Sequence, residues 1–209
     1  MTAEPVDWMY PEESAMATEP VDWMHPPPEG WTYEQVKDLD LPFDWELVDG
    51  VIVVRDMTVY WHNRVRDELY VALRSARHAP CEVTTEQCIL IDQYNPARPD
   101  VVVFDRTDLD FFSLECLPVA SVLLAVEVVS HGSRTDDRFR KPGMYAAAGI
   151  PYFWRVERGE DNIPVVHEFR LDEETGRYTA APDVPIHTGV LRTDVPFPVE
   201  LDLAGIFKE

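Results

Sequence analysis

One acidic residue interrupts a strongly apolar run of this 209-residue chain. Residues 121–130 read SVLLAVEVVS, a nearly continuous series of apolar and β-branched residues that is typical of a central strand covered on both faces. Glu127 lies inside this run. A buried carboxylate is costly unless a charged or hydrogen-bonding group compensates for it, and a metal ion is the simplest compensation. The alternative is an acid that only forms a structural ion pair.

A second acid stands at the head of the preceding strand candidate. Residues 97–105 read ARPDVVVFD, and Asp100 can approach Glu127 if the two strands are neighbours. Mg²⁺ is usually held by one or two carboxylates, with water and phosphate oxygens completing its shell. The two acids together therefore favour a divalent-metal site, for Mg²⁺ or Mn²⁺, over a structural ion pair.

Periodicity predicts the elements that position these acids. Residues 43–54 indicate two short strands around an Asp49-Gly50 turn, and apolar positions three and four apart predict an amphipathic helix over residues 60–77. The later elements follow the same rules. They are strands at 82–91, 101–104 and 122–129, a helical stretch at 133–148 interrupted at Pro142-Gly143, a strand at 151–156, and a hairpin at 164–179. The core order is helix, three strands, helix, strand.

An ordered set of motifs resembles the Uma-two family of restriction-endonuclease-like proteins, from about residue 43 to the carboxyl terminus. The set is Phe43 to Gly50, His62-Asn63, Arg98-Pro99-Asp100, Glu127 to Ser130, Asp137 to Lys141, Tyr145, Gly149 and Tyr152-Phe153-Trp154. The resemblance implies the PD-(D/E)XK nuclease fold. This is an α/β (α+β) restriction-endonuclease-like core with a central mixed β-sheet flanked by helices, with additional N- and C-terminal hairpin strands.

The resemblance also implies roles for residues of this sequence. The superfamily's two metal-binding acids fall on Asp100 and Glu127, but its lysine, two residues after the second acid, is replaced here by Val129. The implied catalytic lysine is therefore Lys141, which would reach the site from the following helix. The structural alternative is a solvated Lys141 that pairs with Asp137 at i, i+4.

The implied activity is that of a metal-dependent endonuclease hydrolysing phosphodiester bonds of DNA. The metal would lower the pKa of a bound water, and Lys141 would orient that water or stabilise the charge that develops on phosphorus. Two accessory residues are predicted. Glu46 would complete the acidic cluster, and His62 would support a ligand or contact phosphate. Their alternatives are a surface strand residue and a packing histidine.

The charge of the chain favours a second class of function. The net charge is −21; residues 1–50 hold thirteen acids and one lysine, which leaves −9 for the rest. Neutralising phosphates requires clustered Lys and Arg, so nucleic-acid binding would have to be local or metal-assisted. The acidic surface and Val129 favour a catalytically inactive nuclease-fold module with a binding or regulatory role. No phosphate-binding GxxxxGK[ST] loop, HExxH or GxSxG motif occurs.

A change in composition divides the chain into two parts. Residues 1–40 are predicted to form an acidic, disordered tail, and residues 41–209 the nuclease-like domain. The tail contains EPVDWM at residues 4–9 and again at 19–24, a repeat that would suit a protein partner. A homodimer is the other predicted assembly, because cutting both strands of a duplex needs two sites.

The remaining sequence features concern the compartment. No signal peptide and no apolar run of about 18 residues is present, so a cytoplasmic protein without membrane contact is expected. Cys81, Cys88 and Cys116 are odd in number and lack CxxC spacing, so free thiols are expected rather than a disulfide framework or a zinc site.

Overall fold

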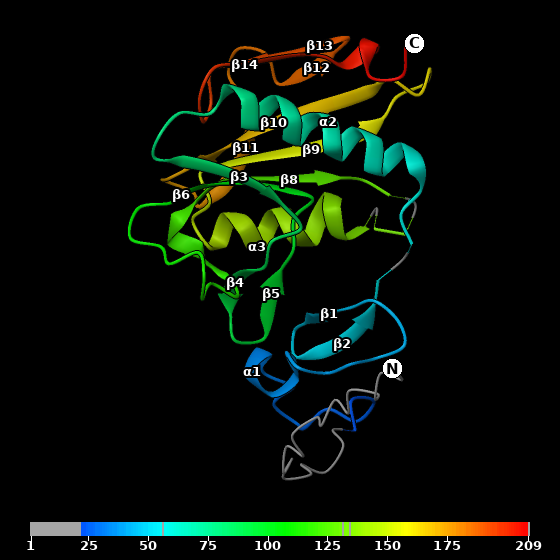
Figure 1. Ribbon diagram of the computed structural model, residues 1–209, viewed down its shortest axis with the longest axis vertical. Coiled ribbons are helices and arrows are strands. Elements are labelled where there is room, and N and C mark those ends of the chain that lie inside the picture. Colours follow the sequence, from blue (N-terminus) through cyan, green and yellow to red (C-terminus); the bar gives the residue numbers. More distant parts are fainter. Residues whose placement is uncertain (1–21, 56, 131, 134, 209) are drawn as a thin grey trace, which may run out of the picture.

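The computed structural model describes residues 22–55, 57–130, 132–133 and 135–208, and its centre is a mixed β-sheet (Figure 1). The strand order in the sheet is β11-β10-β9-β8-β6-β3, and β12 also pairs with β10. The bounds are β3 Cys81–Thr85, β6 Val101–Asp105, β8 Val122–Val128, β9 Tyr152–Arg158, β10 Pro164–Asp172, β11 Arg177–Ala180 and β12 Ile186–Thr188. Strand β8 lies antiparallel to β6 and parallel to β9. The predicted central mixed sheet is confirmed.

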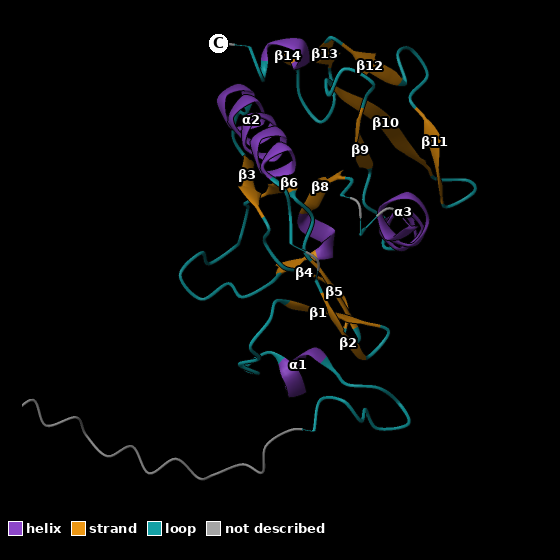
Figure 2. Cartoon of the chain, turned by 90° about the vertical axis from the view of Figure 1, so that its right-hand side faces the viewer, coloured by secondary structure: helices purple, strands orange, loops and turns teal. Residues whose placement is uncertain are grey.

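Two helices cover opposite faces of this sheet (Figure 2). Helix α2, Tyr60–Ala76, buries Val65, Leu69 and Leu73 at four-residue spacing against one face, as the predicted amphipathic pattern requires. Helix α3, Lys141–Ala147, packs on the other. Among the described helices, none is long and apolar enough to cross a membrane.

The alternation of β8 determines where its acid points. Leu124, Val126 and Val128 belong to the core beneath α2, whereas Ala125 belongs to the core beneath α3. Successive side chains of a strand point to opposite faces, so Glu127 shares the α3 side with Ala125. The acid in the central strand therefore faces the helix that carries Lys141.

The helix that carries Lys141 begins in an unusual way. A π-helical turn, η2 (Asp136–Arg140), runs directly into α3. Pro142 sits in the first turn of α3, where its missing N–H is not needed, and Gly149 with φ of 82° follows the helix end. The predicted interruption at Pro142 thus appears as a change from π to α geometry, which is a frequent feature of functional sites.

The hairpin predicted at residues 43–54 is confirmed as β1 (Trp45–Val48) and β2 (Val51–Val54), joined at Asp49-Gly50. Its small core also receives α1 (Tyr33–Val36), and Trp23 packs against it. The packed part of the chain therefore starts before residue 41. The first copy of the EPVDWM repeat lies outside the described residues.

Two expectations are corrected in the segment between β3 and β8. The single strand expected at 82–91 is two strands, β3 and β4 (Ile89–Asp92), because the chain turns at Glu86, where φ is 51°. Strand β4 leaves the main sheet and joins β5 (Asn95–Ala97) and β7 (Leu117–Pro118).

The second correction concerns the cysteines. Cys88 and Cys116 form a disulfide, so the expectation of free thiols is wrong for this pair, and only Cys81 is free. The physical reason is the parallel pairing of Ile89 with Leu117, which brings the two preceding residues together with a Cα–Cα distance of 4.5 Å.

The carboxyl-terminal part closes the fold beside α2. Strands β13 (Val190–Thr193) and β14 (Val199–Asp202) form the predicted terminal hairpin, and the 3₁₀ turn η3 (Leu203–Gly205) follows it. A second 3₁₀ turn, η1 (Val119–Ser121), leads into β8. Leu191, Val199 and Leu203 join the core beneath α2.

Candidate active site

A pocket of about 420 Å³ opens where β8 ends. The start of α2, the carboxyl end of β8 and the η2–α3 segment meet at this edge of the sheet (Figure 1). All five residues singled out in the sequence line the pocket: Glu46, His62, Asp100, Glu127 and Lys141. The fold therefore brings these residues together from β1, α2, the head of β6, β8 and α3.

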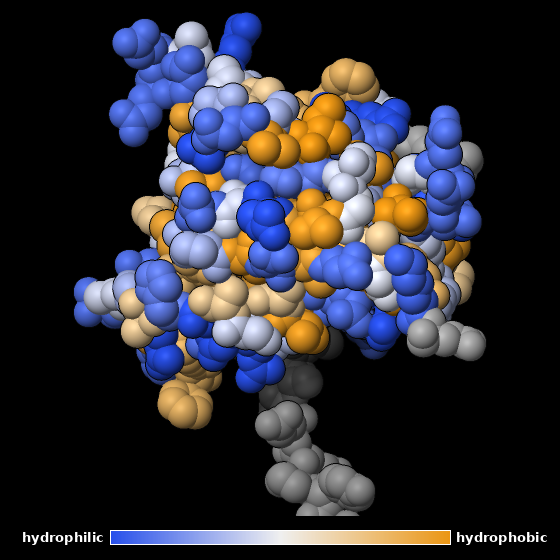
Figure 3. All heavy atoms as spheres, turned by 90° about the horizontal axis from the view of Figure 1, so that it is seen from above, coloured by the Kyte–Doolittle hydropathy of each residue, from blue (hydrophilic) through white to orange (hydrophobic). Residues whose placement is uncertain are grey.

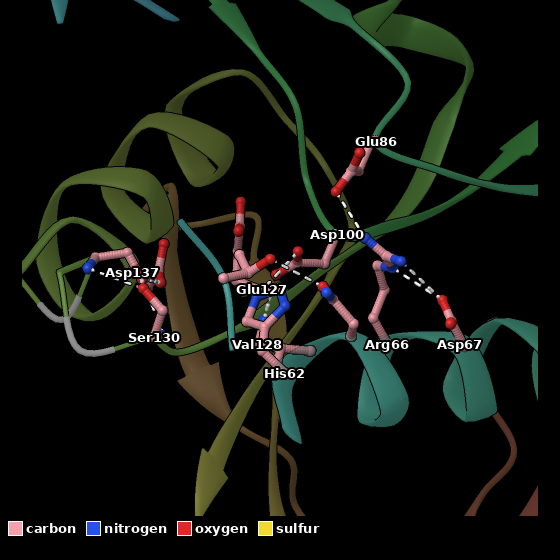
Figure 4. Close-up of polar contacts among 12 residues, drawn as sticks. His62, Arg66, Asp67, Glu86, Asp100, Glu127, Val128, Ser130 and Asp137 are labelled. Carbon is pink, nitrogen blue, oxygen red and sulfur yellow. Dashed lines mark hydrogen bonds and ion pairs between the residues drawn. The ribbon is translucent and has the colours of Figure 1, made fainter. Parts of the chain in front are cut away.

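Asp100 is held rigidly at the head of β6. Its side chain is 7% exposed, its Oδ2 accepts a hydrogen bond of 2.7 Å from the backbone N–H of Val128, and its Oδ1 lies 3.2 Å from Nε2 of His62 (Figure 4). Burial lowers the pKa of His62, but the Asp100 carboxylate outweighs it and raises that pKa above its usual value. His62 on α2 thus orients Asp100.

Glu127 is buried and held from α3 on both oxygens. Its Oε2 accepts a 2.9 Å hydrogen bond from Nζ of Lys141, and its Oε1 accepts a 2.6 Å hydrogen bond from the hydroxyl of Tyr145. Burial raises the pKa of Glu127 above its usual value; Lys141 opposes this shift, whereas Asp137 and Asp100 add to it. This carboxylate therefore lies in a site with an excess of negative charge.

Lys141 is the cation of this acidic cluster. Its Nζ lies 2.9 Å from Oδ1 of Asp137 as well as from Oε2 of Glu127, and its side chain is 11% exposed. Burial lowers its pKa, but Glu127 and Asp137 outweigh burial and raise the pKa above the usual value, so the ammonium stays charged. The predicted i, i+4 pair with Asp137 exists, but Lys141 is not a solvated helix residue.

Two contributors to the site were not assigned a role there from sequence. Asp137 is almost fully buried and accepts a hydrogen bond from Ser133, and Tyr145 is fully buried. Burial raises the pKa of both side chains. The spacing of Asp137, Lys141 and Tyr145 is the signal that could have found them, because residues four apart share a helix face.

Glu46 lies at the edge of the pocket rather than among the buried acids. Its side chain is 21% exposed, and its Oε1 is 3.9 Å from Nη2 of Arg140, which also binds Asp136 at 2.9 Å. Glu46 thus lines the same pocket while pairing with an arginine.

The donor set suits a hard divalent cation that is shared with a substrate. Within the described residues, no three His, Cys, Asp or Glu side chains are grouped closely enough to hold a metal ion by themselves. Asp100 and Glu127 nevertheless present buried carboxylate oxygens to one pocket, and Mg²⁺ commonly takes only one or two carboxylates together with water and phosphate oxygens. The excess negative charge at Glu127 is the feature that such a cation would relieve.

Comparison with known proteins places the chain in a family. Residues 32–201 match the Uma2 family, which is described as "Putative restriction endonuclease". The chain belongs to the Uma2 family. The resemblance found in the sequence is therefore confirmed over most of the domain. No curated protein matches this Uma2 chain.

A solved structure supports the fold independently. It is a crystal structure from Anabaena variabilis, described as "a putative nuclease belonging to DUF820", with a TM-score of 0.62 and 15% sequence identity. The match covers 84% of this Uma2 chain and 97% of the Anabaena chain. At this identity the likeness establishes a shared fold, and the predicted fold class is confirmed.

Proposed function

We propose that this Uma2 protein is a metal-dependent endonuclease that hydrolyses phosphodiester bonds of DNA. The observation that supports the proposal most strongly is the convergence of Asp100, Glu127 and Lys141 in one pocket at the end of β8. These residue types supply what phosphodiester hydrolysis needs: oxygen ligands for a cation and a charged group beside the reacting phosphate.

In this proposal Asp100 and Glu127 hold Mg²⁺ or Mn²⁺. When bound, the cation would lower the pKa of a water and stabilise negative charge on a phosphate oxygen. Val128 N–H and His62 keep Asp100 in place, and Tyr145 keeps Glu127 in place. Preorganised ligands of this kind spare the site the cost of reorganising during the reaction.

Lys141 is the residue proposed to act on the substrate itself, and His62 is proposed to support the metal ligand Asp100. Lys141 carries a positive charge at the pocket wall, where it would stabilise the charge that develops on phosphorus. His62 binds Asp100 through Nε2, while its buried Nδ1 has no hydrogen-bond partner among the described residues. Because Nδ1 has almost no solvent-accessible surface, His62 would act through Asp100, whose carboxylate it orients, rather than by contacting the phosphate.

A nuclease-fold binding or regulatory module without turnover is the second candidate. The observation that favours it is that Nζ of Lys141 already lies 2.9 Å from both Glu127 and Asp137, while Val129 occupies the usual lysine position. A lysine that pairs with two carboxylates would stabilise the fold and would not take part in a reaction.

Cleavage assays separate the two candidates. Purified protein is incubated with plasmid and single-stranded DNA at low salt with Mg²⁺, Mn²⁺ or chelator, beside Glu127→Gln, Lys141→Ala and Glu168→Gln, a control at a buried acid away from the pocket. The nuclease proposal expects metal-dependent cleavage that the first two variants lose and the control retains. Wild-type protein that cleaves neither DNA with either metal would overturn the proposal and favour the binding module.

A further inference from the structure

Two further pockets continue from the active-site pocket along the same edge of the fold. The first, of about 580 Å³, shares His62, Ser130 and Gly132 with the active-site pocket. The second, of about 690 Å³, shares Val59, Trp61 and Arg158 with the first. The three pockets are therefore neighbours and lie in a row from the end of β8 to the carboxyl-terminal segment, and we describe this row as a groove. We call the part beyond the candidate active site the exit groove, defined by Tyr60, Trp61, Arg158, Asn162, Phe207 and Lys208.

Aromatic rings line the exit groove on a rigid support. Trp61 is nearly buried, and its Nε1 donates a 2.7 Å hydrogen bond to the carbonyl oxygen of Asn162. Phe207 stacks on Trp61 with ring centroids 6.4 Å apart and remains 42% exposed, and Tyr60 at the start of α2 is 76% exposed. Figure 3 shows that apolar side chains form separate surface patches on the end of the molecule that carries β12–β14. Two rings are thus available to a flat ligand.

Positively charged side chains along the groove can also contact a ligand. Among the described residues, no carboxylate lies within ion-pair distance of Arg158 or Lys208 in the exit groove, or of Arg55 in the active-site pocket. Arg158 lies 5.6 Å over the Trp61 ring and binds the side chain of Asn162. In a chain of net charge −21, cations along one groove that have no ion-pair partner in the described part of the chain favour an anionic ligand.

Two acids also line the pockets of the groove. Glu157 lines the first pocket, but its carboxylate is already bound by Arg138 and Arg155. Asp161 lines the second pocket beside Arg158 and Lys208. The groove therefore combines exposed aromatic rings with two cations, Arg158 and Lys208, that have no ion-pair partner among the described residues and outnumber the one acid of their pocket, Asp161. Aromatic rings beside cations are the pattern that binds unpaired nucleotides.

We propose that the exit groove binds single-stranded DNA that flanks the cleaved bond, with bases stacked on Tyr60 and Phe207 and phosphates near Arg158 and Lys208. The proposal rests on the proposed nuclease function, because it places the flanking strand in a continuation of that active site. Paired bases of a duplex hide their faces in the helical stack, so only unpaired nucleotides can stack on these rings. The preferred substrate would carry a single-stranded segment next to the scissile bond.

Binding without cleavage tests this inference separately from catalysis. The affinity of a fluorescently labelled single-stranded oligonucleotide and of the matched blunt duplex is measured by anisotropy with the Glu127→Gln protein in chelator. We expect the single strand to bind more tightly. The double variant Tyr60→Ala/Phe207→Ala should weaken single-strand binding by about 10-fold or more, and Arg158→Gln should weaken it by a smaller factor.

Matched controls keep the result interpretable. Phe112→Ala removes a fully exposed ring elsewhere, and Arg177→Gln removes an arginine of the β10–β11 hairpin that has no ion-pair partner within the described residues; both variants should bind as the parent does. Tyr60→Phe keeps the ring and should retain affinity. Unchanged affinity in the double variant, equal loss in the controls, or tighter binding of the blunt duplex would overturn the inference. If the double variant lost affinity for the single strand but the wild-type protein cleaved no DNA, the exit groove would be supported and only the nuclease proposal would be overturned.

Discussion

Two glutamates on the central sheet have equal burial but different surroundings. Glu127 on β8 and Glu168 on β10 are both 2% exposed. Glu168 lies 3.3 Å from Nε2 of His187 and 3.5 Å from Nη2 of Arg170. It lines none of the five principal pockets, whereas Glu127 lines the candidate active-site pocket. Burial of a carboxylate is therefore not by itself a sign of function.

The balance of charge separates the two sites. Glu168 is one acid with two basic partners, which is a structural solution for a buried carboxylate. Around Glu127, the acids Asp100 and Asp137 also approach the pocket, and these three acids have two basic partners: Lys141 pairs with Glu127 and Asp137, and His62 pairs with Asp100. Excess negative charge that opens onto a pocket destabilises the empty site and suits it to a cation.

The largest effect is expected when the acid-rich site loses its lysine. Lys141→Met would leave Glu127 and Asp137 without their cation, which should lower the free energy of unfolding by about 3–5 kcal/mol. Arg170→Met beside Glu168 should cost less, because His187 remains. Urea unfolding at neutral pH measures both. Adding Glu127→Gln to Lys141→Met should restore part of the lost stability. If Lys141→Met and Arg170→Met lowered the free energy of unfolding equally, the proposed difference in charge balance between the two sites would be contradicted.

The second largest effect is expected in DNA cleavage, which should differ between Glu127→Gln and Glu168→Gln. Glu127→Gln removes a proposed metal ligand and should lower metal-dependent cleavage by about 100-fold or more. Glu168→Gln should leave cleavage nearly unchanged while lowering the free energy of unfolding by about 1–3 kcal/mol, because His187 and Arg170 lose a charged partner. Plasmid nicking and urea unfolding on the same preparations give both quantities. A Glu168→Gln protein that had lost activity but kept wild-type stability would show that Glu168 has a functional role and not a structural one.

Much of the fold was predictable because local patterns and tertiary contacts agree. The four-residue spacing from Val65 to Leu73 specifies α2, and the apolar run around Glu127 specifies a central strand. The disulfide was not predictable, since Cys88 and Cys116 meet only through the pairing of β4 with β7, a contact between segments 28 residues apart. The packing of Trp23 against the first hairpin is likewise a tertiary contact.

Residues of the candidate site could be predicted where a charged side chain interrupts an apolar sequence pattern. Glu127 stood out because a carboxylate in an apolar strand violates the local rule, and such violations tend to mark functional sites. Glu168 did not stand out, because β10 alternates buried and partly exposed residues and an acid there reads as surface. Asp137 was partly hidden by its spacing from Lys141, which is equally typical of a solvated helix pair.

A smaller effect is expected from the hydroxyl that orients Glu127. Tyr145→Phe keeps the ring in the core and removes the 2.6 Å hydrogen bond to Oε1. Supporting residues of this kind typically contribute about 10- to 100-fold to metal affinity or activity, so the variant should require more Mg²⁺ for half-maximal cleavage. Tyr178→Phe, which removes a hydroxyl bound to the backbone of Ile150, is the matched control and should keep the wild-type metal requirement. An unchanged requirement in Tyr145→Phe would mean that Lys141 alone orients the carboxylate.

The smallest effect concerns His167, the neighbour of Glu168 on the opposite face of β10. Burial and the nearby Arg155 lower the pKa of His167; Arg138 adds to this, and Glu157 opposes it. Because the folded-state pKa lies below the unfolded value, the unfolded chain binds more protons, so stability is lost as pH falls from about 6.5 through the folded pKa. His167→Gln should remove this part of the acid dependence, measured as the difference between the two proteins in urea unfolding at pH 7.5 and pH 5.5. If both proteins lost stability in parallel as the pH fell, the loss of stability would come from groups other than His167.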